Sequence, residues 1–159
     1  MIPDQFLEMA QAYRVLSGME PDQLRKLLPL AEEKEYPAGR IIFREGGLSS
    51  FLHLITSGEV ALEMKIGGEV VRVQTLHAGD AMGWSALTAD CTTHFQARAL
   101  SPVSTVAFAG ARLREECDRN PRMGYGLMKR LLELVTDRLD ATRMQLVGGR
   151  QEPELTRQP

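Results

Sequence analysis

The stretch His77–Leu100, "HAGDAMGWSALTADCTTHFQARAL", joins two glycine turns to a loop of hydroxyl side chains and then to a β-prone run. Gly79 and Gly83 let the chain turn sharply, because glycine adopts backbone conformations that strain other residues. The loop carries an indole and four hydroxyl groups, on Trp84, Ser85, Thr88, Thr92 and Thr93. Hydroxyl groups can hold an anion or a polar ligand, and an indole can stack on a planar ring. The stretch therefore predicts a pocket-like loop.

Residues 32–109, which surround this loop, consist of short β-prone runs separated by glycines. Large apolar side chains stand at every second position of Val60–Lys65, which is the period of a half-buried strand. The pair Gly67-Gly68 between two such runs is a strong signal for a hairpin. Regular short strands with turns predict a closed or sandwiched antiparallel sheet.

Helical patterns flank this β region on both sides. We expect N-terminal helices within residues 3–30 and C-terminal helices within residues 110–147, the last one long and starting at Pro121. Gly148-Gly149 is a typical C-terminal stop, and the polar tail 150–159 is predicted to be disordered. The sequence thus predicts one α+β domain over residues 1–149.

The long helix carries a regular apolar stripe, whose spacing of four, three, four, three and four residues is that of a coiled-coil seam. Its members are Met128, Leu132, Val135, Leu139, Thr142 and Leu146. A neighbouring stripe holds Leu127, Leu131 and Leu134, so the apolar face is wider than one packing surface needs. The pattern favours a parallel homodimer through this helix. The alternative is a single amphipathic helix that packs only on its own domain.

Composition narrows the classes of function. The net charge of −2 gives no basic field for nucleic acid, and no apolar run is long enough to cross a bilayer. The acidic N-terminus is not a signal peptide. Cys91 and Cys117 lack the spacing of metal ligands, so we expect free thiols in a cytoplasmic protein.

Catalytic chemistry and cofactors are not indicated. His53, His77 and His94 lie in separate runs without metal-site spacing, and neither a nucleophile elbow nor a phosphate-binding glycine loop is present. A cupin-type metal site lacks its histidine cluster, and a haem site rests only on the presence of His77 and Cys91. We therefore predict a non-enzymatic protein without metal or cofactor.

Four segments together resemble the cyclic nucleotide-binding domain of the catabolite activator family and of the regulatory subunits of cyclic-AMP-dependent kinases. They are "AGRIIFREGG" (38–47), "FLHLITSGEVAL" (51–62), "LHAGDAMGWSAL" (76–87) and "ARALSPVSTVAF" (97–108). With the flanking helices the resemblance covers roughly residues 14–147. It implies an antiparallel β-roll of the double-stranded β-helix, or jelly-roll, type between N-terminal helices and a long C-terminal helix.

The same resemblance implies a phosphate-binding loop, and this chain departs from it. In the family a glutamate accepts a hydrogen bond from the ribose and an arginine pairs with the cyclic phosphate. Trp84 stands at the glutamate position here, Thr93 at the arginine position and Thr92 at the preceding proline. A hydrogen bond to a charged group contributes about 1.5–3 kcal/mol. We therefore do not expect tight binding of cyclic AMP or cyclic GMP in the family's mode.

Three hypotheses remain open. The first is a regulatory module that binds a nucleotide-like or other anionic small molecule and signals through its dimerising helix. Its candidate ligand-binding residues are Gly83, Trp84, Ser85, Ala86, Thr92, Thr93, Thr142 and Arg143. The second is a scaffold with an unknown protein partner, in which Trp84 fills a degenerate pocket. The third is a binder of cyclic nucleotides with low affinity. If the chain is full length, too few residues follow Gly149 for a DNA-binding module, and we expect no membrane partner.

Overall fold

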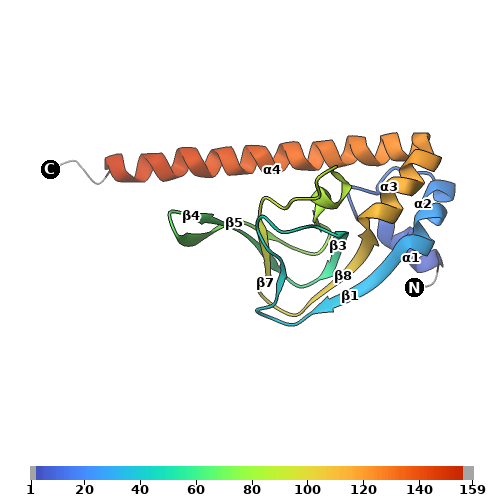
Figure 1. The fold of residues 1–159 in the computed structure, drawn as a ribbon, viewed down its shortest axis with the longest axis horizontal. Coiled ribbons are helices and arrows are strands. Elements are labelled where there is room, and N and C mark those ends of the chain that lie inside the picture. The colour runs from blue at the N-terminus through green and yellow to red at the C-terminus, as the bar shows by residue number, and fades with distance from the viewer. Residues whose placement is uncertain (1–2, 156–159) are drawn as a thin grey trace.

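The computed structural model describes residues 3–155 and shows a two-sheet β-roll with helices packed on one side (Figure 1). The helices are α1 (Pro3–Ala10), α2 (Pro21–Leu27), α3 (Gly110–Arg119) and α4 (Pro121–Leu155), with short 3-10 turns η1 (Leu28–Leu30) and η2 (Trp84–Leu87). The strands are β1 (Ala31–Tyr36), β2 (Ile41–Phe43), β3 (Phe51–Ser57), β4 (Val60–Ile66), β5 (Glu69–Leu76), β6 (Ala81–Met82), β7 (Gln96–Ala99) and β8 (Val103–Ala109).

The strands form two four-stranded sheets, in the orders β1-β8-β3-β6 and β2-β7-β4-β5. Every strand pair is antiparallel. The prediction of an α+β fold, an antiparallel roll between N-terminal helices and a long C-terminal helix, is confirmed. The β4–β5 hairpin turns at Gly67 and Gly68, both with positive φ, as their sequence indicated.

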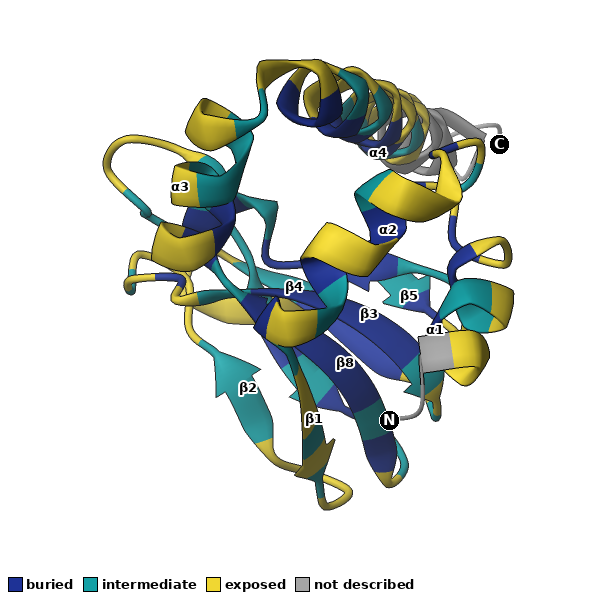
Figure 2. Ribbon diagram, turned by 90° about the vertical axis from the view of Figure 1, so that its right-hand side faces the viewer, coloured by how far each residue is buried: buried dark blue, intermediate teal, exposed yellow. Residues whose placement is uncertain are grey.

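Two apolar clusters hold the roll together, because β3 sends alternate side chains to opposite faces. Leu52 and Leu54 join the cluster beneath the helices, together with Phe6 and Phe108. Ile55 faces the other way and packs between the two sheets. Figure 2 shows the buried segments of β3 and β8 lying under the helices. The first sheet is therefore packed on both faces.

Helix α4 runs along the whole molecule and extends past the β4–β5 hairpin (Figure 1). Its stripe of Leu127, Leu131 and Leu134 is buried in the helix-side core. In the second stripe, Leu132 and Leu139 are 67% and 59% exposed. The exposed members of this stripe are Met128, Leu132, Leu139 and Leu146, whereas Val135 packs against the core and Thr142 is half-buried.

The prediction that the long helix ends at Val147 is wrong, because α4 continues through Gly148-Gly149 to Leu155. A glycine inside a helix costs only about 1 kcal/mol relative to alanine. It ends a helix when the chain turns back there in the left-handed conformation, and this chain does not turn back. Part of the predicted tail 150–159 is therefore helical, and residues 156–159 lie outside the described part.

Gly58 makes the tight turn between β3 and β4, with φ of +90°. A Cβ at this position would overlap the carbonyl oxygen of Pro102. Gly67 also has a positive φ, of +59°, but a Cβ there would have no heavy atom within 4 Å. A substitution at Gly67 therefore introduces backbone strain alone, whereas one at Gly58 introduces strain and steric overlap.

We expect Gly67→Ala to lower the free energy of unfolding by about 1 kcal/mol through backbone strain alone. Gly58→Ala adds the overlap and should cost about 1–3 kcal/mol more. Urea titration followed by circular dichroism measures both. Equal losses in the two variants would contradict the close approach of Pro102.

Candidate functional site

The candidate loop, residues 80–94, is anchored to the first sheet at its beginning. Ala81 and Met82 of β6 pair with Leu54 and His53 of β3. Gly83 follows with φ of +80°, and a Cβ on it would overlap the carbonyl oxygen of Phe51. This close approach requires glycine, and it fixes where η2 begins with Trp84.

Thr93, at the far end of the loop, is only 3% exposed. Its hydroxyl donates to the carbonyl oxygens of Arg44 and Gly47, and its backbone N–H donates to Gly47 at 2.9 Å. Both donors therefore hold the turn that follows β2. In this packing Thr93 has no free donor for an anion.

The middle of the loop is held by Arg114 of α3. Its Nη1 donates to the carbonyl oxygen of Ala86 at 2.6 Å and lies 3.2 Å from the Sγ of Cys91. Asp90 accepts from the backbone N–H and the hydroxyl of the threonines beside it, Thr92 and Thr88, and these hydrogen bonds lower the pKa of its carboxyl group. The loop is therefore a compact turn rather than an open strap.

Trp84 lies between the roll and α4. Its ring packs edge-on against Phe95, with 6.3 Å between centroids, and the guanidinium of Arg138 lies 4.4 Å from its centroid. Beside it remains a cavity of about 10 Å³. The lining residues are Phe43, Leu62, Gly83, Trp84, Ser85, Thr93, His94 and Phe95. Ligand pockets usually measure about 300–1,000 Å³, so this space holds at most one water molecule.

Arg138 connects this loop to α4. It is only 7% exposed, and its Nη2 donates to the carbonyl oxygen of Ala81. Its Nη1 is buried without a hydrogen-bond partner among the described residues. Burial lowers the pKa of the guanidinium to about 10, opposed by the nearby carboxylate of Asp80. Arg138 stays charged at neutral pH, and its unsatisfied N–H costs about 1–3 kcal/mol.

The structure brings together only some of the residues that the sequence singled out. Gly83, Trp84, Ser85 and Thr93 line the small cavity, whereas Ala86 and Thr92 do not. Thr142 donates its hydroxyl to the carbonyl oxygen of Arg138 at 2.9 Å, and Arg143 lies 3.7 Å from Asp140 on the surface of α4.

Sequence reasoning missed Arg138 as the α4 residue that reaches the loop. It lies one helical turn before Thr142, on the same face. The sequence pattern indicates which face of α4 turns towards the roll, but it does not indicate which turn of the helix meets the loop. Phe43 of β2 and Phe95, just before β7, were also missed, since aromatic residues in or beside strands are ordinary core residues.

Within residues 3–155, no three or more His, Cys, Asp or Glu side chains gather as metal ligands would. Over the same residues, the helices are too polar or too short to cross a bilayer.

The comparisons identify the family. The model of the family described as "Cyclic nucleotide-binding domain" matches residues 33–120. These residues span both sheets, the candidate loop and α3. The chain therefore belongs to the cyclic nucleotide-binding domain family. No curated protein sequence matches this chain.

Solved structures agree with this assignment. A Geobacter metallireducens protein assigned as a cyclic nucleotide-binding protein is 31% identical, over 87% of this chain and 99% of its own, with a TM-score of 0.74. The Thermus thermophilus Catabolite Activator Protein is 24% identical over 84% of this chain and 61% of its own, with a TM-score of 0.70. The regulatory subunit of a cAMP-independent protein kinase A from Trypanosoma brucei is 20% identical over 68% of this chain and 39% of its own, with a TM-score of 0.62. The last two share the fold.

His53 lies beneath the candidate loop with its ring between the sheets. It is 4% exposed, and its Nδ1 lies 3.3 Å from the hydroxyl oxygen of Thr105. Burial, with a further effect of the Lys34 charge, lowers its pKa to about 4. The folded protein therefore keeps this histidine neutral where an exposed histidine takes up a proton.

An unfolded chain protonates His53 near pH 6.5, so the free energy of unfolding should fall as pH drops from about 6.5 towards 4. The expected loss is on the order of 3 kcal/mol over this range. We expect His53→Gln to remove this part of the slope, since glutamine does not titrate. Denaturant titrations at stepped pH compare the two proteins. The same slope in both would show that His53 is not buried as described.

Proposed function

We propose that this protein is a non-enzymatic regulatory module in which Trp84 occupies the ligand space of the fold in the closed state. The observation that carries the proposal is that only a cavity of about 10 Å³ remains beside Trp84, whose ring is covered by the guanidinium of Arg138. A ligand must displace the indole before it can enter. Displacement would free Arg138 and change the packing of α4.

Standard binding of a cyclic nucleotide has little support in this loop. The family's arginine position holds Thr93, whose hydroxyl is already used by the Arg44 and Gly47 carbonyl oxygens. The family's glutamate position holds Trp84. A buried phosphate needs a fixed cation with paired donors, and no side chain of the loop supplies one. The Trypanosoma brucei subunit with this fold belongs to a protein kinase A that is described as cAMP-independent.

Coupling between loop and helix runs through Arg138. Its contacts with Trp84 and Ala81 both lie in the loop region, while its backbone belongs to α4. Because its Nη1 lacks a partner, the closed packing does not satisfy every buried donor. An anionic or planar ligand could satisfy this donor and take the place of the indole. Such a ligand would shift the population between two packings.

A nucleotide-like or other anionic ligand should therefore produce two linked signals. Trp84 is the only tryptophan, so its emission should shift to longer wavelength when the indole leaves its packed position and meets water. A ligand at one hundred times its dissociation constant adds about 2.7 kcal/mol of stability, which corresponds to a rise of roughly several degrees in Tm. We expect both signals together from an anionic compound in a panel of cyclic nucleotides, cyclic dinucleotides, ATP and anionic metabolites.

Cyclic AMP and cyclic GMP should produce neither signal with the native chain. The double variant Trp84→Glu with Thr93→Arg tests the assignment of the two family positions, because it restores both charged contacts. Stabilisation of the native chain by a cyclic nucleotide with unchanged Trp84 emission would contradict the proposal. The weak-binder hypothesis would then take its place.

A scaffold is the second candidate, and the same filled cavity favours it. In a scaffold Trp84 is permanent core, and function lies in the helices and a protein partner. No compound of the panel should then change Tm or emission. Trp84→Gly separates the two cases further. A ligand-binding roll should keep its ligand specificity when the indole is removed, whereas a scaffold should only lose stability.

We also propose that α4 forms a parallel homodimer. Four large apolar side chains of its outer stripe are exposed in the single chain, and they follow heptad spacing along the helix. A monomer would leave this stripe in water. A second copy of the helix would cover it.

Leu132→Glu with Leu139→Glu should convert the dimer to a folded monomer, because buried carboxylates at the seam repel each other. Met144→Glu is the control, since Met144 is 73% exposed and lies off the stripe. Sedimentation velocity at micromolar concentration distinguishes the states. A native chain that sediments as a monomer would exclude the dimer.

A further inference from the structure

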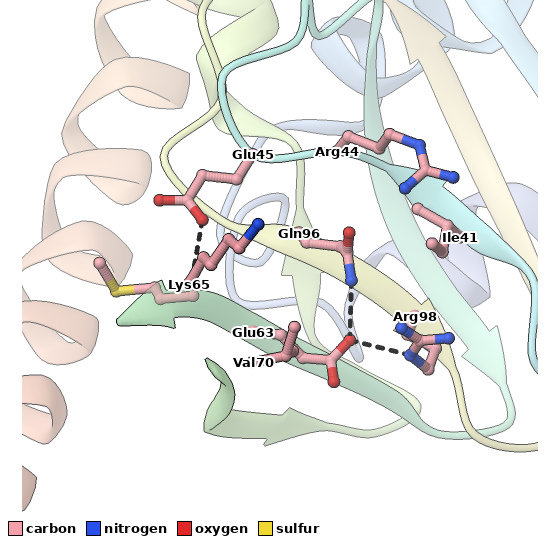
Figure 3. Close-up of a pocket in the computed structure, with 9 residues that line it drawn as sticks. Ile41, Arg44, Glu45, Glu63, Lys65, Val70, Gln96 and Arg98 are labelled. Carbon is pink, nitrogen blue, oxygen red and sulfur yellow. Dashed lines mark hydrogen bonds and ion pairs between the residues drawn. The ribbon is translucent and has the colours of Figure 1, made fainter. Parts of the chain in front are cut away.

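The outer face of the second sheet carries a groove of about 620 Å³ that is separate from the candidate loop (Figure 3). We call it the basic groove. Its lining residues are Ile41, Arg44, Glu45, Glu63, Met64, Lys65, Val70, Gln96 and Arg98. They come from β2 and the turn after it, from β4 and β5, and from β7. Side chains alternate along β4, so Leu62 points into the roll while Glu63 lies in the groove.

Both carboxylates of the basic groove are already engaged. Glu63 Oε1 accepts hydrogen bonds from Gln96 at 3.1 Å and from Arg98 at 2.9 Å. Glu45 accepts the backbone N–H of Lys65 at 3.0 Å. The ammonium of Lys65 and the guanidinium of Arg44 have no hydrogen-bond or ion-pair partner within the described part of the chain. Two cations are therefore free on a protein whose net charge is −2.

The groove also has an apolar component. Figure 3 shows Ile41 between the guanidinium groups of Arg44 and Arg98, and Val70 is 55% exposed. Aromatic side chains, on which unpaired bases would stack, are missing from the lining. Cations around aliphatic side chains match carboxylates interspersed with apolar residues. This chemistry is that of an acidic peptide rather than of a nucleic acid.

We propose that the basic groove docks an extended acidic segment of a partner protein. Carboxylates of the segment pair with Arg44 and Lys65, and apolar side chains between them cover Ile41 and Val70. In an extended segment of alternating acidic and apolar residues, the carboxylates and the apolar side chains each recur at every second position. No lining residue of the groove belongs to the candidate loop, and the loop meets the groove only through the backbone of the turn after β2, where the Arg44 carbonyl oxygen accepts from Thr93.

Fluorescence polarisation tests the groove with a labelled peptide in which glutamate and valine alternate. Arg44→Glu with Lys65→Glu should weaken binding roughly tenfold, because each reversal replaces attraction with repulsion. The matched control is Arg25→Glu with Lys26→Glu, which makes the same charge change on exposed positions of α2. The control should bind as the native chain does, and added salt should weaken the native binding.

Several outcomes would overturn the proposal: no binding of the peptide to the native chain, equal losses in the two variants, or tighter binding of an RNA or duplex DNA oligonucleotide that the same groove variant abolishes. Circular dichroism checks that the variants are folded. Arg44→Gln with Lys65→Gln repeats the test with a milder change, and it should also weaken binding of the peptide.

Discussion

The contact between Trp84 and Arg138 joins the candidate loop to the long helix α4. The indole packs between the roll and α4, and the buried guanidinium lies over its face, 4.4 Å from the ring centroid. The same guanidinium reaches the carbonyl oxygen of Ala81, so one side chain of α4 holds both ends of the first turn of the loop. A buried cation is tolerated here because an aromatic face and a carbonyl oxygen replace part of its hydration. Its remaining N–H at Nη1 is buried without a hydrogen-bond partner in the described part of the chain.

Much of the fold follows from local chemistry in the sequence. The alternation in β4 and the Gly67-Gly68 turn define a hairpin by themselves. Gly83 and Gly58 stand where the backbone comes against another carbonyl oxygen, which only glycine permits. On α4 the stripe of Leu127, Leu131 and Leu134 is buried. The second stripe is largely exposed, except at Val135, which packs against the core, and at Thr142, which is half-buried.

The parts that could not be predicted depend on the placement of one element on another. The pattern of α4 defines its inner face but not which turn meets the loop, so Arg138 was missed while Thr142 and Arg143 were singled out. The hydroxyl of Thr93 suggested a ligand contact, yet a long-range turn after β2 uses it. The end of α4 was misjudged because glycine stops a helix only when the chain has somewhere to turn.

The length of α4 gives the Trp84–Arg138 contact a mechanical meaning. Leu155, at the end of the helix, lies 17 positions after Arg138, which corresponds to roughly 25 Å of helix. A tilt of about 10° at Arg138 would move that end by roughly 4 Å through this rise per residue. A small reorientation of α4 at its contact with the indole would therefore be enlarged several-fold at the far end of the helix.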